Sequence, residues 1–110
     1  MVVSTRELVA LCGDNWPGLF PKGRTVYVIV DALEWKRGKS KVKPVVARCI
    51  VLEIWYDDAP GSDQVWLQME NKDRFGYLDA RIDDDSFFEK VFLFEDEAHA
   101  ALKLKQEDAE

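Results

Sequence analysis

The chain has 110 residues, of which 47% are hydrophobic, 33% charged and 12% aromatic, and its formal net charge is −6. This composition excludes a disordered chain and predicts one self-folding domain with a single core. Two cysteines are too few for a disulfide framework, and residues 1–7 lack a signal-peptide pattern, so we expect a cytoplasmic protein without a membrane span.

Residues 1–21 are predicted to form a short helix followed by a packed loop. Ser4 stands three residues before Glu7, and apolar residues then recur at helical spacing up to Gly13, which indicates a helix capped by Ser4. The segment 14–23 contains two prolines and two glycines, which predicts a loop. Three large apolar side chains are expected to hold this loop on the domain: Trp16, Leu19 and Phe20.

Residues 22–94 are predicted to form a β-barrel. Residues 25–30 are β-branched and aromatic, which indicates the first strand. Residues 34–44 are hydrophilic and basic, which predicts an exposed, mobile loop. Residues 45–56 contain no Gly, and apolar residues stand at both odd and even positions. This pattern predicts one long strand buried on both faces, with Ile54 on one face and Trp55 on the other.

The second half of the chain continues this pattern of strands and ends in a helix. Residues 57–63 predict a turn, after which Val65, Leu67 and Met69 alternate with Trp66, so Trp66 is expected to face outward. Two further strands are expected at 75–82 and 89–94. The last helix is predicted at 95–106, because three acidic residues at its start suit the helix dipole.

The order of these elements resembles a small, highly curved barrel of the Src-homology-3 type. Residues 22–28 are similar to the opening strand of such barrels, residues 47–54 to their long second strand, and residues 91–103 to the strand-to-helix close of small bacterial, prophage and mobile-element proteins. The resemblance implies a mainly β fold, a five-stranded barrel with flanking helices, across residues 22–105. In those proteins a Ser or Thr often caps the last helix, whereas Phe94 stands at that position here.

Charge is distributed unevenly along the chain. Residues 1–56 carry a balance of +4 and residues 57–110 a balance of −10. The acidic total argues against generic nucleic-acid binding, since neutralising phosphates needs a basic surface. The acidic run Asp83, Asp84 and Asp85 lacks the alternating ligands and central Gly of a calcium loop, which favours a solvated turn over a metal site.

No pattern of catalytic or cofactor-binding residues is present. His99 is the one histidine, the glycines form no phosphate-binding loop, and Cys49 lies in the most apolar segment, where a buried structural role is expected. We therefore expect no catalytic residue, cofactor or metal.

Three functional hypotheses remain open. The first is a non-enzymatic module for an unidentified protein partner, with a phage or mobile element as the suggested origin and with Trp35 and Trp66 as aromatic anchors. The second is an acidic decoy, formed by Asp83 to Asp85, of a protein that handles nucleic acids. The third is weak nucleic-acid binding through Lys36, Arg37 and the basic residues up to Lys43, with Trp35 available for base stacking.

Overall fold

The computed structural model describes residues 4–57, 60–61, 64–73 and 76–108, with side chains throughout except at 34, 36, 85 and 106–108. Within these ranges the elements follow one another as α1 Thr5–Cys12, the 3₁₀ helix η1 Gly13–Leu19, β1 Thr25–Lys36, β2 Lys39–Tyr56, β3 Val65–Asn71, β4 Tyr77–Arg81, the 3₁₀ helix η2 Asp85–Glu89, β5 Val91–Phe92 and α2 Glu95–Asp108. No helix among them is long and apolar enough to cross a membrane.

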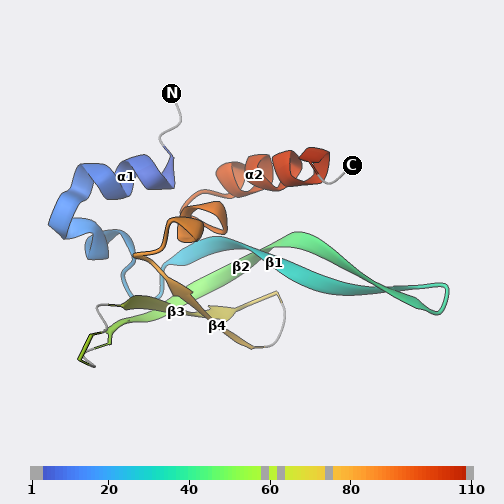
Figure 1. Ribbon diagram of the computed structural model, residues 1–110, viewed down its shortest axis with the longest axis horizontal. Coiled ribbons are helices and arrows are strands. Elements are labelled where there is room, and N and C mark those ends of the chain that lie inside the picture. Colours follow the sequence, from blue (N-terminus) through green and yellow to red (C-terminus); the bar gives the residue numbers. More distant parts are fainter. Residues whose placement is uncertain (1–3, 58–59, 62–63, 74–75, 109–110) are drawn as a thin grey trace.

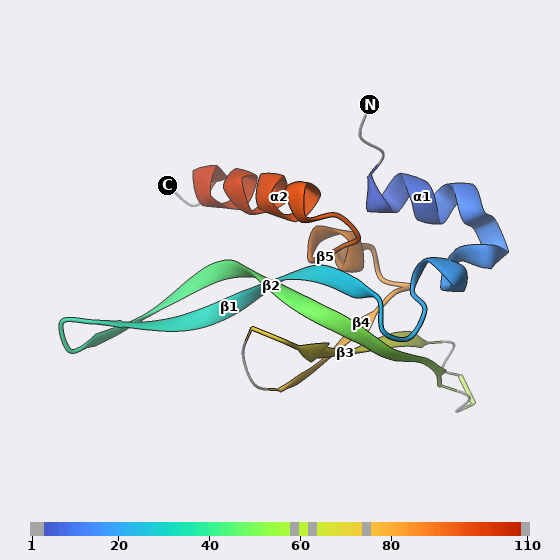
Figure 2. The same ribbon diagram turned by 180° about the vertical axis from the view of Figure 1, so that it is seen from behind.

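The strands form one antiparallel sheet, and the predicted fold class is confirmed. Their order is β4-β3-β2-β1-β5, and the sheet curls into a half-barrel with helices at both ends of the chain (Figures 1 and 2). Consecutive strands β1 to β4 lie beside one another because short turns join them, whereas β5 returns to pair with β1 at Tyr27 and Val28.

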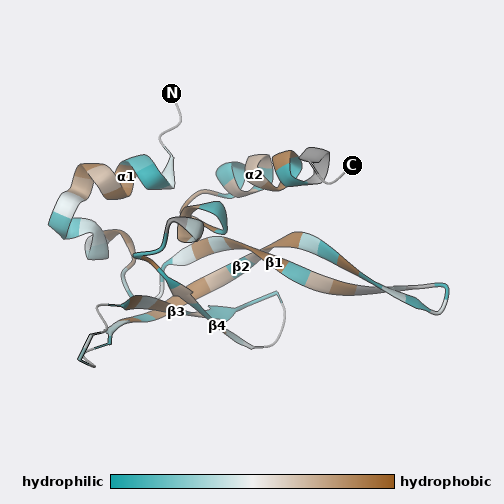
Figure 3. Ribbon diagram, viewed as in Figure 1, coloured by the Kyte–Doolittle hydropathy of each residue, from teal (hydrophilic) through white to brown (hydrophobic). Residues whose placement is uncertain are grey.

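The two faces of the β1–β2 pair are buried by different neighbours. On the concave face, Val26, Val28 and Cys49 join the main core together with residues of β3, η1 and η2. On the opposite face, Ile29 packs with Ala98 of α2 in a smaller core. Val46 of β2 is therefore covered by α2, whereas Arg48 on the same face is exposed, and hydrophobic colouring gathers in the middle of both strands (Figure 3).

A β-bulge changes which residues of β2 face the core. The register shifts between Val51 and Glu53, so Leu52 is an extra residue without a partner in β3. Because side chains alternate, one extra residue exchanges the two faces beyond it. Ile54 consequently packs against the main core and Trp55 faces outward, which is the reverse of continuous alternation along residues 45–56.

The prediction of a mobile loop at residues 34–44 is wrong. β1 and β2 pair without interruption from Thr25↔Ile50 to Lys36↔Lys39, so only residues 37 and 38 lie outside the strands. The segment is hydrophilic because it is an exposed hairpin, which composition alone does not distinguish from a loop.

Other element boundaries differ in smaller ways. Residues 14–19, expected to be loop, form most of η1, and Pro17 fits within this short 3₁₀ segment. The strands expected at 75–82 and 89–94 are shorter, and α2 extends two residues past 106. The predicted cap is confirmed, because the Ser4 hydroxyl accepts a hydrogen bond from the Glu7 amide at 3.1 Å.

A hydrogen-bond cluster joins the two ends of the chain. The Glu97 carboxylate accepts bonds from the Thr5 amide at 2.8 Å and from the Thr5 hydroxyl at 2.5 Å. The same hydroxyl accepts a bond from the Leu93 amide at 2.9 Å. Thr5 is fully buried, so Glu97 of α2 caps the first turn of α1 and fixes both helices to the strand end before α2.

Removing the Thr5 hydroxyl should therefore destabilise the whole domain. We expect Thr5→Ala to lower the free energy of unfolding by about 2–3 kcal/mol, because a bond to a charged group is lost and the Leu93 amide is left buried without its acceptor. Thr5→Ser, which keeps the hydroxyl, should recover most of this loss. Glu95→Gln, at an exposed position on α2, serves as the control in urea denaturation. Equal stability of Thr5→Ala and wild type would contradict the assigned role.

Candidate functional site

The most distinctive surface feature is a two-stranded arm formed by the end of β1 and the beginning of β2. We call residues 31–44 the ribbon arm; it extends beyond the end of α2 (Figures 1 and 2). Arg37 and Gly38 both have positive φ, 55° and 78°, as the two central residues of a type I′ hairpin turn do. Such turns match the natural twist of the two strands, so the arm is a defined element.

Pairing in the arm separates its side chains into two chemically different faces. Directly paired residues of antiparallel strands point to the same side. The pair Leu33↔Val42 and the pair Trp35↔Ser40 therefore lie on one face, which we call the apolar face. Lys39, Lys41 and Lys43 lie on the other, which we call the basic face.

The apolar face is exposed over its whole length. Trp35 is 70% exposed, Leu33 54% and Val42 61%. The face continues the side of the sheet on which Ile29 and Val46 are covered by α2. On this side the pair Asp31↔Pro44 separates the covered residues from Leu33 and Val42. The helix ends before the hairpin does, so the apolar face of the arm lies beyond its cover (Figure 1).

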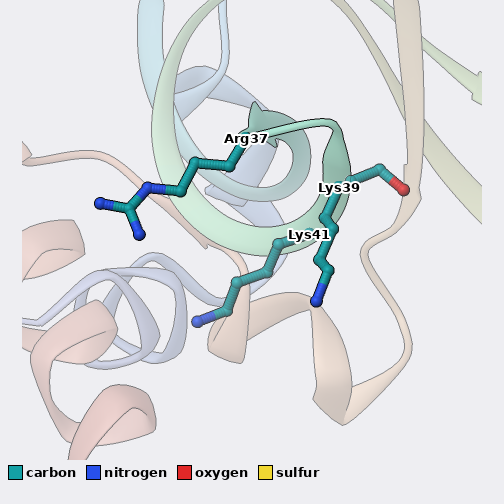
Figure 4. A pocket seen from close by; sticks show the side chains of 4 residues that line it. Arg37, Lys39 and Lys41 are labelled. Atoms are coloured by element: carbon teal, nitrogen blue, oxygen red, sulfur yellow. The ribbon is translucent and has the colours of Figure 1, made fainter.

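The basic face carries three exposed lysines at alternate positions of β2. Figure 4 shows Arg37, Lys39 and Lys41 extending outward from the hairpin, around a shallow hollow that Ser40 also lines. Among residues whose side chains are described, none forms an ion pair with these lysines or with Arg37. Lys36, a predicted site residue, pairs with Lys39 in the ladder, but its side chain lies outside the described part.

Trp66 lies elsewhere, on the outer side of β3. Its ring stacks on Trp55, its direct cross-strand partner, with centroids 5.7 Å apart and an interplanar angle of 10°. Its indole N–H donates to the Gln64 side chain at 3.2 Å. Trp66 is thus half-buried and already engaged, and the structure does not bring it together with Trp35.

The acidic run lies at the end of β4, and its described carboxylates are engaged within the protein. Asp83 accepts two hydrogen bonds from Arg81, at 2.8 and 3.0 Å, and this pairing holds the pKa of Asp83 below its usual value. Asp84 accepts a bond from the Ser86 amide and caps η2. The Asp85 side chain lies outside the described part. Within the described residues, no three His, Cys, Asp or Glu side chains are placed to hold a metal ion.

The remaining reactive residues show no shared site. Cys49 is fully buried in the main core, and burial together with the nearby Asp73 charge raises its thiol pKa to about 11. Cys12 is half-exposed on α1, and His99 is exposed on α2.

Sequence reasoning identified Trp35 and Arg37 but not Leu33 and Val42. The signal for these two was present, since Leu33 and Trp35 on one side of Arg37-Gly38 mirror Ser40 and Val42 on the other. A glycine-containing two-residue turn flanked by alternating residues indicates a hairpin. The density of lysines concealed this alternation.

Comparison with known proteins found no matching family model, no matching curated protein and no matching solved structure.

The turn predicts opposite effects for two substitutions at the tip. Gly38→Ala should accelerate hydrogen exchange of the arm amides about fivefold, because a side chain at positive φ costs about 1 kcal/mol. Arg37→Asn should slow it severalfold, since Asn tolerates positive φ better than Arg. Gly18→Ala, at a position with open space and no positive φ, is the control. Exchange measured by NMR that does not respond to either tip substitution would contradict a formed type I′ turn.

The two thiols should differ strongly in reactivity. At pH 8 a thiol with pKa about 11 is roughly 0.1% thiolate, the form that reacts. Ellman's reagent should therefore modify Cys12 rapidly and Cys49 only after denaturation. The Cys12→Ser variant should show almost no reaction in the folded state, whereas rapid labelling of that variant would show that Cys49 is accessible.

Proposed function

We propose that the protein is a non-enzymatic protein-binding module whose contact element is the ribbon arm, with Trp35 as the anchor of the apolar face. The observation that supports this most is the contiguous exposure of Leu33, Trp35 and Val42 on a projecting hairpin. Exposed apolar patches of this kind commonly mark interaction surfaces. Tryptophan is also among the residues enriched at the energetic centres of interfaces.

The geometry of the arm favours binding in a second respect. The side chains of Leu33 and Val42 are direct neighbours in the ladder, and Trp35 is diagonal to Val42. The ladder holds these three side chains in a fixed arrangement before any partner arrives, which reduces the entropy lost on binding. The acidic run is less suited as a contact surface for a partner, because Asp83 and Asp84 already make hydrogen bonds inside the domain.

A purely structural role for these residues is the main alternative. Cross-strand pairs of aromatic and β-branched residues stabilise hairpins by about 0.2–1 kcal/mol. In that case Trp35 would support the arm without any partner. The two explanations differ in whether loss of the ring changes capture of another protein.

The chain offers a matched control for this test. Tyr77 on β4 is 70% exposed, the same fraction as Trp35, but lies off the arm. Purified wild type, Trp35→Ala and Tyr77→Ala would each be used to capture proteins from cells that produce this protein, with quantitative mass spectrometry. We expect one partner to be retained by wild type and Tyr77→Ala and reduced at least tenfold with Trp35→Ala, since anchor residues contribute about 2 kcal/mol or more.

Calorimetry with the purified partner should then reproduce the difference. Equal capture by Trp35→Ala and wild type, or equal loss in both variants, would contradict the proposal. Circular dichroism of each variant checks that the fold is retained.

A further inference from the structure

We propose that the basic face of the ribbon arm binds the phosphate backbone of duplex nucleic acid. This activity is separate from protein binding, because it uses the side of the arm opposite to Trp35. The sequence predicted an exposed basic loop. In the structure these cations instead occupy fixed positions on a paired strand.

The lysines form a regular row. Lys39, Lys41 and Lys43 follow one another at every second residue of β2, so their Cα atoms are spaced by about 6.7 Å along the strand. Arg37 adds a fourth cation at the turn. Such a row presents repeated positive charge in one direction, which is the pattern a phosphate backbone neutralises.

Several cations on the body of the domain are already paired. Arg48 contacts Asp73 at 3.1 Å, Lys72 contacts Glu70 at 3.4 Å and Arg81 contacts Asp83 at 2.8 Å. The lysines of the basic face have no such ion pair among the described side chains. Glu34 is the ladder partner of Lys41, and its side chain lies outside the described part.

Projection of the arm also counters the acidity of the protein. Residues 31–44 contain five Lys or Arg and two Asp or Glu, a balance of +3, which leaves −9 for the rest. Six residues of strand place the turn about 20 Å from the base of the arm. The Debye length is about 8 Å at physiological salt, so repulsion from the acidic body is largely screened at the tip.

The separation of the two faces favours duplex over single-stranded nucleic acid. Single-strand sites combine cations with aromatic side chains on which the bases stack. Here Trp35 points to the opposite side from the lysines, so one strand cannot use both. A two-stranded ribbon fits the major groove of a duplex, where lysines reach phosphates and the apolar face remains outside.

The simplest alternative role for the arm lysines is to protect an unpaired strand edge from aggregation. Beyond its pairing with β3, the outer edge of β2 is unpaired in the described residues, and lysines on such edges prevent aggregation. This role requires charge but no ligand. A binding measurement with a charge-matched control therefore separates the two.

The test uses purified full-length protein and a fluorescein-labelled 20-base-pair DNA, followed by fluorescence anisotropy between 25 and 200 mM NaCl. Two triple variants carry the same net charge: Lys39, Lys41 and Lys43 changed to Gln on the arm, and Lys22, Lys90 and Lys103 changed to Gln on the body. These last three lysines are exposed and lie off the arm.

We expect wild type to bind at low salt with log K falling against log[salt] at a slope of about −2.7 to −3.6, as three or four phosphate contacts require. The arm variant should bind roughly tenfold or more weakly, with the slope reduced by about 2.7. The body variant should bind like wild type. Trp35→Ala should also bind DNA normally, so failure of this proposal and failure of protein binding through Trp35 are distinguishable.

Four results would overturn the proposal. These are absence of binding at 25 mM NaCl, equal loss of affinity in both triple variants, tighter binding to a single-stranded 20-mer than to the duplex, and binding to vesicles of anionic lipid or to polyglutamate with affinity equal to that for DNA. The third result would identify a single-strand site and the fourth a general polyanion surface.

Discussion

The register of β1 against β2 is the constraint on which the rest of the structure depends. Pairing from Thr25↔Ile50 to Lys36↔Lys39 continues from the core into the arm without interruption. Since side chains alternate, this single register decides which residues meet the main core, which meet α2 and which form the two faces of the arm. A slip of one residue along β2 would put Lys41 beside Leu33 and remove Ala47 from the main core, so the core and the arm are specified together.

The same coupling explains how an exposed two-stranded ribbon is stable. Isolated hairpins are marginal in water because each strand has only one partner. Here the base of the ribbon is clamped between the main core and α2, and the type I′ turn at Arg37 and Gly38 closes its tip. Thr5 and Glu97 hold α2 in place through α1, so contacts at the chain ends support the surface from which the arm projects.

Sequence patterns predicted the local elements more successfully than their extent and surroundings. The β-branched strand segments and the Ser4 cap depend on residues that are close in the sequence, so one sequence is enough to predict them. The Leu52 bulge is set by β3, and the Thr5–Glu97 bonds join residues 92 positions apart, so neither leaves a local signal. The arm differs from the predicted loop because its lysine-rich composition is typical of loops, although its residues alternate as those of a hairpin do. Likeness to a Src-homology-3 barrel remains a prediction.

The spatial distribution of charge differs from its distribution along the chain, and this difference bears on both proposed activities. Along the sequence the positive half includes Arg48, yet in the folded protein Asp73 neutralises that side chain while the arm lysines stay in solvent. An acidic body with a basic projection favours approach of a polyanion from the side of the arm. Because the apolar face then points away from the bound polyanion, a protein partner on Trp35 and a duplex on Lys41 would occupy opposite sides of one ribbon. The arm would therefore join the two ligands directly, without any rearrangement of the domain.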